Sequence, residues 1–453
     1  MCRSALLWLK KKELILINNL KLFTSREKFL TCLALLGLLG IIYYSVFFTI
    51  YGCLPEPFLY DKSDTFMDFY NPLYWTFEPS RYETWKSIYP PLNFLILKIF
   101  TFVISDEFQF TAKSIREKYG QIILIFFIFY LILPLILFKS KDWSIFSYKD
   151  KFLLYFVVIF STPMLFALER GNLILITLPL LSLVFCESKL IRIVSIAILV
   201  NIKPYLWLFS FFYIVRKKWK DFIVLSTFSG FIFVITGLLL GGNFFTFFYN
   251  IIDYAGNSNL YSIREVLAMP SSISALSSAL EYISSNYYIK LNYINSLNFI
   301  TPEALILISI LCKIVKLSSL FFALTVLFRR EAVLEDWQII VLIIALITNL
   351  GLFTGGYSMI FYVVCIPYFM RMKFKNVYII IISLMSAPLD LISIYHALSV
   401  DYIWSYLGSG EIYYQWCMSL GALARPILNL SLLIILAIEF FGSSNHKMPS
   451  YKS

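Results

Sequence analysis

The sequence predicts an all-α fold of the polytopic helical membrane class, with about ten spans and a re-entrant helix pair. Of the 453 residues, 60% are hydrophobic and 14% are charged, whereas soluble domains contain roughly 45–50% and 25%. Apolar runs of about 18 residues, long enough to cross a bilayer, recur along the chain. A water-soluble enzyme is therefore excluded, and we expect one integral-membrane domain over residues 1–453.

The net charge of +11 lies in short basic blocks between apolar runs, which indicates membrane orientation rather than binding to nucleic acid. Basic loops of membrane proteins face the cytoplasm. We therefore expect both chain ends and four basic segments on the cytoplasmic side. These segments are residues 1–28, 139–152, 216–220 and 371–375.

Three loops are expected on the outer side of the membrane. The segment 242–302 contains only two basic residues, Arg264 and Lys290, and the segment 396–415 contains none. The loop 52–118 is mixed, with seven basic and nine acidic residues. Its side is set by the first span, because long loops cross the membrane largely regardless of charge.

Ten spans fit between these loops. The first is expected to be retained, because its apolar run begins only near Phe29 and no small-residue cleavage site follows it. The predicted spans are residues 29–51, 119–138, 153–168, 173–187, 222–241, 303–328, 337–354, 357–370, 376–395 and 416–440.

Residues 190–215 do not fit a single crossing, because basic residues flank them on both sides. A pair of half-helices bent at Lys203-Pro204 would keep both ends in the cytoplasm. Proline lacks a backbone donor and disfavours helix at the residue before it. We therefore predict a re-entrant pair here.

Several familiar kinds of catalytic site are disfavoured. The chain has seven cysteines and two histidines, and it contains no HExxH, paired CxxC or GxxxxGK[ST] pattern. A zinc enzyme, a P-loop ATPase and a Ser-His-Asp hydrolase do not fit this pattern. We expect no obligate metal and no cofactor.

The first outer loop carries three carboxylates within eight residues: Asp61, Asp64 and Asp68. A carboxylate near the membrane surface is a candidate general base. The alternative is a solvated acidic loop.

Two cations lie near the expected outer face, Arg170 in a short turn and Lys203 at the tip of the re-entrant pair. Burying a cation among apolar helices costs free energy unless the cation binds an anion. A lipid phosphate is an available anion at the membrane face. The alternatives are a snorkelling side chain or, for Arg170, an ion pair with Glu169.

Four short motifs occur in a specific order along the chain, followed by a basic Arg-Lys-Lys-Trp block at 216–219. They are Asp-Phe-Tyr at 68–70, Tyr-Pro-Pro at 89–91, Arg-Gly-Asn at 170–172 and Ile-Lys-Pro-Tyr at 202–205. This arrangement resembles the polyprenyl-phosphate-sugar-dependent glycosyltransferases of the GT-C fold, and among them glycosyltransferase family 87, the alpha-mannosyltransferase-like membrane proteins. The resemblance covers residues 29–221 and, more weakly, 355–368, but not 242–302.

The resemblance implies an inverting hexosyltransferase that moves mannose or glucose from a polyprenyl-phosphate donor to a glycan or glycolipid acceptor. The resemblance also implies that the reaction takes place on the extracytoplasmic face. The residue usage, rich in Ile, Phe, Tyr, Asn and Lys, favours a protein of a bacterial inner membrane that modifies O-antigen or another surface polysaccharide. Asp68 matches the family's loop aspartate and would be the base. Arg170 and Lys203 would stabilise the departing phosphate, and Asp61 and Asp64 are possible acceptor-binding residues.

Other polar residues are weaker candidates. Tyr89, Tyr357 and Arg264 could bind donor or acceptor, although Arg264 could equally form a surface pair with Glu265. Trp75 and Trp85 could stack on sugar rings or belong to the aromatic belt. Two charges at span depth, Asp390 and Arg425, are expected to form a structural ion pair.

Three other functions compete with glycosyl transfer. An O-antigen polymerase has no rigid signature by which it could be excluded, although it fits the first outer loop less well. A lipid-linked oligosaccharide flippase would need charges along a central cavity, which are few here. An ion-coupled transporter would favour inverted repeats, and only one bent segment is found.

Overall fold

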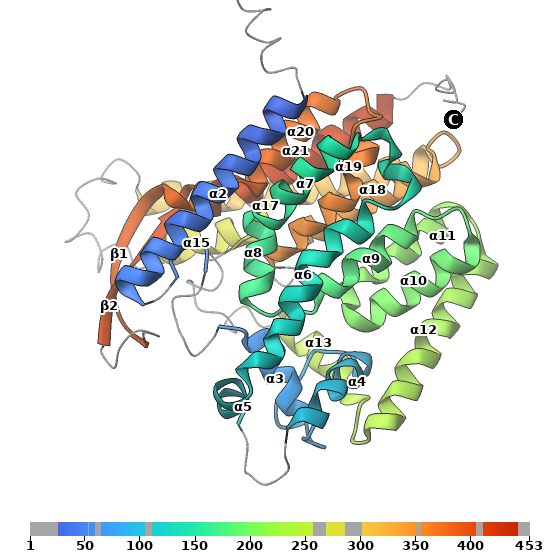
Figure 1. Cartoon of the computed structure of the whole chain (residues 1–453). Coiled ribbons are helices and arrows are strands. Elements are labelled where there is room, and N and C mark those ends of the chain that lie inside the picture. The colour runs from blue at the N-terminus through green and yellow to red at the C-terminus, as the bar shows by residue number, and fades with distance from the viewer. Residues whose placement is uncertain are drawn as a thin grey trace, which may run out of the picture.

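The computed structural model describes residues 26–52, 54–58, 65–104, 111–256, 269–285, 301–350, 355–404 and 411–442. These residues form a helical membrane protein, as the sequence predicts, with one two-stranded sheet (Figure 1). Among the described residues, five helices are long and apolar enough to cross a bilayer, or six if a bent pair counts as one span. The long helices are α2 (Arg26–Tyr51), α6 (Ile123–Leu137, preceded by a short turn from Gly120), α12 (Trp219–Leu240), α17 (Pro302–Arg329) and α21 (Leu420–Gly442).

The expected count of ten spans is not confirmed, because several of the predicted spans are short helices. Their 11 to 14 residues reach about 16–21 Å at 1.5 Å per residue, against a bilayer core of ~30 Å. The bent pair consists of α7 (Tyr148–Ile159) and α8 (Thr162–Glu169) and turns by 51°. The short helices are α9 (Ile174–Val184), α18 (Asp336–Asn349), the continuous η8 (Gly356–Ile360) and α19 (Phe361–Phe369), and α20 (Lys375–Ser386).

The predicted span 376–395 is wrong in its second half. Helix α20 ends at Ser386, and Ala387 is extended with a ψ of 151°. The following residue, Pro388, disfavours helix at Ala387. After a short turn, β1 (Ser393–Trp404) pairs antiparallel with β2 (Glu411–Ser419), so that Ser393 lies opposite Ser419 and Trp404 opposite Glu411.

The segment 190–215 bends where the sequence predicts. Helix α10 (Lys189–Ile202) ends before Lys203, and η4 (Pro204–Ser210) and α11 (Phe211–Val215) follow Pro204. The two ends of the segment converge on one carboxylate. Asp336 accepts from Arg192 at 2.9 Å and from Arg216 at 2.9 Å, so the chain leaves this segment beside the place where it enters.

The described residues of the four basic segments, which begin at Arg26, lie at one end of the molecule. Asp150 pairs with Arg26 at 3.3 Å, and Asp142 pairs with Arg371 at 3.3 Å. Lys217 contacts Glu331, and Arg330 donates to the Phe441 carbonyl at 2.9 Å. Glu439, two residues before Phe441, accepts from the Lys373 N–H at 2.8 Å. These contacts connect all four segments into one polar layer.

The opposite end of the molecule, at the bottom of Figure 1, is formed by short helices. A small aromatic core holds the loop after α3 (Met67–Trp75) against α12 and α13 (Thr246–Gly256). It consists of Tyr82, Phe94, Phe233, Phe244 and Phe247. The loop 52–118 is therefore a folded cap within its described residues. The helices of the cap are α3, α4 (Pro91–Lys98), η1 (Ile99–Val103) and α5 (Ala112–Lys118). Helix α13, from farther along the chain, packs against them.

The remaining helix, α15 (Ile273–Ser285), packs against α17 and α21. Deep in this region Arg425 and Asp390 form the expected ion pair, with both side chains fully buried and Nη1 2.9 Å from Oδ1. Ser419 also donates to Asp390 at 2.7 Å, and Arg425 Nε donates to the Met385 carbonyl at 3.1 Å. The pair joins the end of α20 to α21, which is a structural role.

Candidate active site

Main-chain hydrogen bonds tie the start of α3 to the turn after α8. Phe66 N–H donates to the Glu169 carbonyl at 2.9 Å, and Asp68 N–H donates to the Arg170 carbonyl at 3.1 Å. Phe66 has a φ of 62°, a left-handed conformation that costs a residue with a side chain about 1–3 kcal/mol. The chain keeps this strain at the place where it presents Asp68.

The Asp68 carboxylate receives two side-chain donors from the same turn. Arg170 Nη2 donates to Oδ1 at 2.8 Å, and Asn172 Nδ2 donates to Oδ2 at 2.6 Å. The Asn172 Oδ1 in turn accepts from the Ile174 N–H at 2.9 Å, at the start of α9. The side chains of Arg170 and Asp68 are 12% and 19% exposed, so the pair is shielded but still accessible from the surface.

Gly171 makes this turn possible. Its φ is +62°, and a Cβ at this position would lie 2.9 Å from the Cβ of Phe69. Only glycine adopts such a φ freely and leaves this space open. The Arg-Gly-Asn motif therefore needs its glycine to bring both neighbouring side chains to Asp68.

Opposing influences set the pKa of Asp68. Burial raises it, but the charge and hydrogen bond of Arg170, the charge of Lys203 and the hydrogen bond from Asn172 lower it. The net result is a pKa below the ordinary value. Asp68 is therefore ionised at neutral pH, as a general base must be. Its contribution to stability is present above the unfolded-state pKa and is lost as pH falls through the lowered folded-state pKa.

We expect the substitution Arg170→Gln to move the acidic limb of the pH–rate profile to higher pH. Removing the cation raises the pKa of Asp68, so the base becomes protonated at a higher pH. Asn172→Leu should move the limb in the same direction by less, since its hydrogen bond has a smaller influence. The measurement is kcat/KM against pH for the parent and both variants, and an unmoved limb in Arg170→Gln would show that Asp68 does not govern it.

Lys203 also lies near this carboxylate. Its side chain is buried, and its Nζ is 5.1 Å from the ring centre of Tyr89 and 5.8 Å from that of Tyr357. Rings stabilise a cation through their negative faces, and the charge of Lys203 also acts on Asp68. The structure thus brings together five residues predicted from the sequence: Asp68, Arg170, Lys203, Tyr89 and Tyr357.

Asn93 holds the tip of the re-entrant pair in place. Its Nδ2 donates to the Ile202 carbonyl at 2.8 Å, and its side chain is fully buried. Pro204 has no N–H, so the helix breaks at this point and carbonyls at its end need other donors. Asn93 follows the Tyr-Pro-Pro motif, and this contact explains why that motif and Lys203 act at one site.

We expect Lys203→Met to lower kcat/KM for a phosphate-linked donor on the order of a hundredfold, as does loss of a charge-stabilising donor in other enzymes. Methionine keeps an unbranched stem but removes the charge. Lys98→Met, at an exposed position of α4, is the matched control and should leave kcat/KM unchanged. If Lys203→Met has the kinetics of the parent chain, Lys203 does not bind the donor phosphate.

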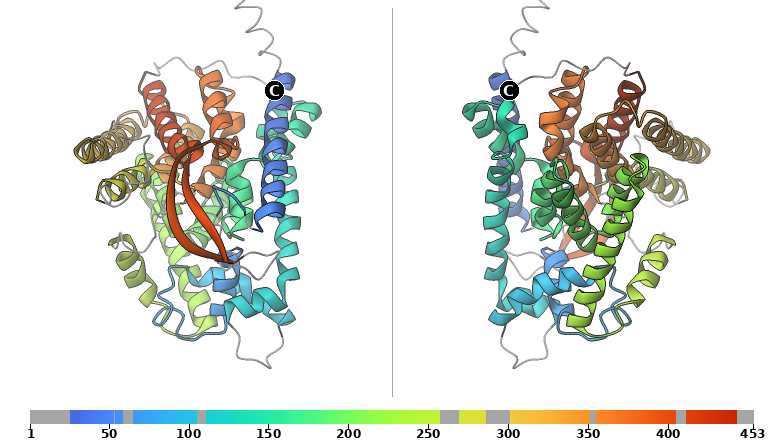
Figure 2. Two further views of the ribbon diagram at one scale, coloured as in Figure 1. Left: turned by 90° about the vertical axis from the view of Figure 1, so that its left-hand side faces the viewer. Right: turned by 90° about the vertical axis from the view of Figure 1, so that its right-hand side faces the viewer.

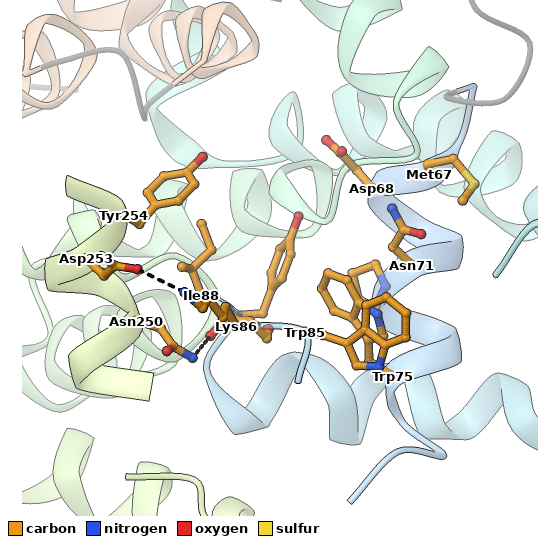
Figure 3. Close-up of a pocket in the computed structure, with 13 residues that line it drawn as sticks. Met67, Asp68, Asn71, Trp75, Trp85, Lys86, Ile88, Asn250, Asp253 and Tyr254 are labelled. Carbon is orange, nitrogen blue, oxygen red and sulfur yellow. Dashed lines mark hydrogen bonds and ion pairs between the residues drawn. The ribbon is translucent and has the colours of Figure 1, made fainter. Parts of the chain in front are cut away.

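A pocket of about 320 Å³ opens beside Asp68. Figure 3 shows Asp68 and Asn71 of α3 on one wall, with Asn250, Asp253 and Tyr254 of α13 facing them. Its other lining residues, besides Tyr89, are Met67, Pro72, Trp75, Trp85, Lys86, Ser87 and Ile88.

Two tryptophans form an aromatic platform in the pocket. The rings of Trp75 and Trp85 are stacked, with centres 6.2 Å apart and planes 22° apart. The α13 wall is fixed by Asn250, which donates to the carbonyls of Tyr82 at 2.8 Å and Ser87 at 3.1 Å. Aromatic rings beside amide and carboxylate groups suit a ligand with both apolar faces and hydroxyl groups, such as a sugar.

Three of the predicted site residues, Asp61, Asp64 and Arg264, lie outside the described residues. Sequence reasoning also missed residues that the structure places at the site. Asn172 was part of the Arg-Gly-Asn motif but was not assigned a role. Asn93 gave no signal, because an amide at a helix start usually has a local role. The polar residues of α13 carried a readable signal, because Asn250, Asp253 and Tyr254 fall at helical spacing on one face.

Comparison with known proteins identifies a family. The sequence model of glycosyltransferase family 87 matches residues 88–348. The match contains Tyr89, Arg170 and Lys203, and it starts after Asp68. It also runs through 242–302, so the expectation that this stretch falls outside the family resemblance is wrong. Comparisons with curated proteins and with solved structures gave no match.

Proposed function

The chain belongs to glycosyltransferase family 87, and from this membership we propose that it transfers a hexose, mannose or glucose, from a polyprenyl-phosphate donor to a glycan or glycolipid acceptor. We place the reaction on the extracytoplasmic face of a bacterial inner membrane. Modification of O-antigen or another surface polysaccharide is the biological setting that we propose.

One observation carries this proposal: an ionised carboxylate and a buried cation flank the same pocket. Asp68 lines the pocket directly, and Lys203 lies against Tyr89, which also lines it. A base on one side and a phosphate-binding cation on the other are the two groups that inverting transfer from a phosphate donor requires. Arg170 pairs with Asp68 at 2.8 Å, so we assign it first to the positioning and ionisation of the base.

The proposed step is a single displacement. The acceptor hydroxyl oxygen forms a bond to the anomeric carbon as its proton passes to Asp68. The bond between that carbon and the phosphate oxygen breaks, and its electron pair leaves with polyprenyl phosphate, whose charge Lys203 stabilises. Configuration at the anomeric carbon is inverted. Neither a metal ion nor a nucleotide takes part in this scheme.

The proposed function is tested by supplying donors to the purified chain in lipid vesicles. Radiolabelled polyprenyl-phosphate mannose and glucose are offered with glycolipids extracted from cells that lack the protein. We expect one donor to label an acceptor, and mass analysis of the surface glycan to show loss of a hexose in those cells. A change in polymer length with no loss of hexose would instead indicate a polymerase.

The proposed orientation predicts the labelling of single introduced cysteines in intact cells. A cysteine at Lys218, in a basic segment that we place in the cytoplasm, should give no more labelling by a membrane-impermeant thiol reagent than the parent chain gives. A cysteine at Thr84, an exposed residue in the folded cap, should react. The reverse pattern would place the pocket in the cytoplasm, where a polyprenyl donor on the outer leaflet could not reach it.

A further inference from the structure

Helix α13 has an outward face that is entirely apolar. Phe248, Tyr249 and Ile252 are 52%, 67% and 71% exposed, and Phe245 just before the helix is also exposed. These positions fall on one side of a helix. A surface helix of a soluble region carries polar residues on its exposed side, so α13 has the reverse pattern.

The other sides of α13 are occupied. Phe247 is buried and packs against Phe233 of α12 with ring centres 5.3 Å apart. Asn250 and Asp253 face the pocket. The described part of the chain nevertheless leaves more than half of each outward side chain uncovered.

This face continues the lipid-facing surface of α12. Leu238 and Leu239, at the end of that helix, are exposed at a membrane span, and Phe233 contacts both Phe245 and Phe248. Figure 2 shows α13 at the edge of the molecule. With 11 residues, it is about 16 Å long and too short to cross a core of ~30 Å.

We propose that α13 lies in the outer interface of the bilayer, with Phe245, Phe248, Tyr249 and Ile252 among the lipids and its polar side forming the pocket wall. Short amphipathic helices bind interfaces in this way, and tyrosine is enriched at headgroup level. One consequence rests on the proposed transfer: α13 would hold the pocket beside the headgroups, where the sugar of a lipid-linked donor lies.

The test uses a photoreactive phenylalanine analogue, p-benzoylphenylalanine, placed at Phe248 or at Ile252 in the full chain. The purified variants are reconstituted in vesicles of phosphatidylethanolamine and phosphatidylglycerol, illuminated and analysed by mass spectrometry. The same analogue at Thr84 is the matched control. Elution of each variant as the parent on gel filtration shows that it is folded, and the two positions on α13 provide independent readings.

We expect both α13 positions to form phospholipid adducts several-fold more often than Thr84. Adduct levels equal to those at Thr84 would overturn the proposal, because α13 would then lie in water. Cross-links to a second copy of the chain would also overturn it, since the apolar face would be a dimer interface. The cross-linking measurement needs no sugar donor, so its result is independent of whether the proposed transfer reaction is correct.

Discussion

Replacing Asp68 with asparagine is expected to lower kcat by a hundredfold to ten-thousandfold, the usual cost of losing a general base. Asparagine has nearly the same shape but cannot accept the proton of the acceptor hydroxyl. Because the substitution leaves Lys203, which we propose binds the donor phosphate, in place, KM for the donor should change less than kcat. The measurement is steady-state transfer by the purified variant in vesicles, with its unfolding midpoint as a check on folding.

The matched control is Asp253→Asn, on the opposite wall of the same pocket. Asp253 pairs with Lys86 at 3.7 Å, and both side chains are well exposed. An exposed pair contributes at most ~1 kcal/mol, so we expect a loss of less than tenfold. Asp61→Asn and Asp64→Asn should also cost less than Asp68→Asn. A larger loss in one of these variants would indicate that the residue it changes is the base. Parental transfer by all of the variants, and by the triple variant of Asp61, Asp64 and Asp68, would show that the reaction uses no carboxylate base.

Arg425→Met is expected to produce the largest loss of stability, about 3–5 kcal/mol in the free energy of unfolding. Removing one partner of a buried ion pair leaves the other charge without compensation. Here that charge is Asp390, whose side chain is fully buried. The measurement is the unfolding midpoint of the purified variant in detergent micelles, compared with that of the parent chain.

Two further variants separate charge from packing. Arg371→Met breaks a pair with Asp142 in which the side chains are 40% and 35% exposed, so we expect it to cost ~1 kcal/mol or less. The double variant Arg425→Met with Asp390→Leu should recover much of the stability, because neither charge is then left alone. A double variant as unstable as Arg425→Met would show that the bonds from Arg425 to main-chain carbonyls, such as that of Met385, matter more than the pairing of charges.

Much of the fold could be predicted because apolar run length and basic blocks report directly on the bilayer. Helices α2, α12 and α17 fall at spans predicted from the sequence, and the break at Lys203-Pro204 follows from the chemistry of proline. The count of spans could not be predicted, because an apolar run does not state whether a helix crosses alone or packs as a shorter piece against a neighbour. The two strands after Pro388 were missed because most of their residues fall in 396–415, which was expected to be an outer loop. Their ends fall in predicted spans, where apolar, β-branched residues suit a strand as well as a helix.

The sequence by itself determined that this protein is a helical membrane protein, and it placed Asp68, Arg170 and Lys203 among the candidates, since charges beside apolar runs are costly and few. Only the tertiary structure decided how they combine. It paired Arg170 with Asp68, set Lys203 between Tyr89 and Tyr357, and brought α13 across from α3 to form a pocket. These contacts join residues more than a hundred positions apart, and such contacts depend on how whole helices pack, which no local pattern in the chain records.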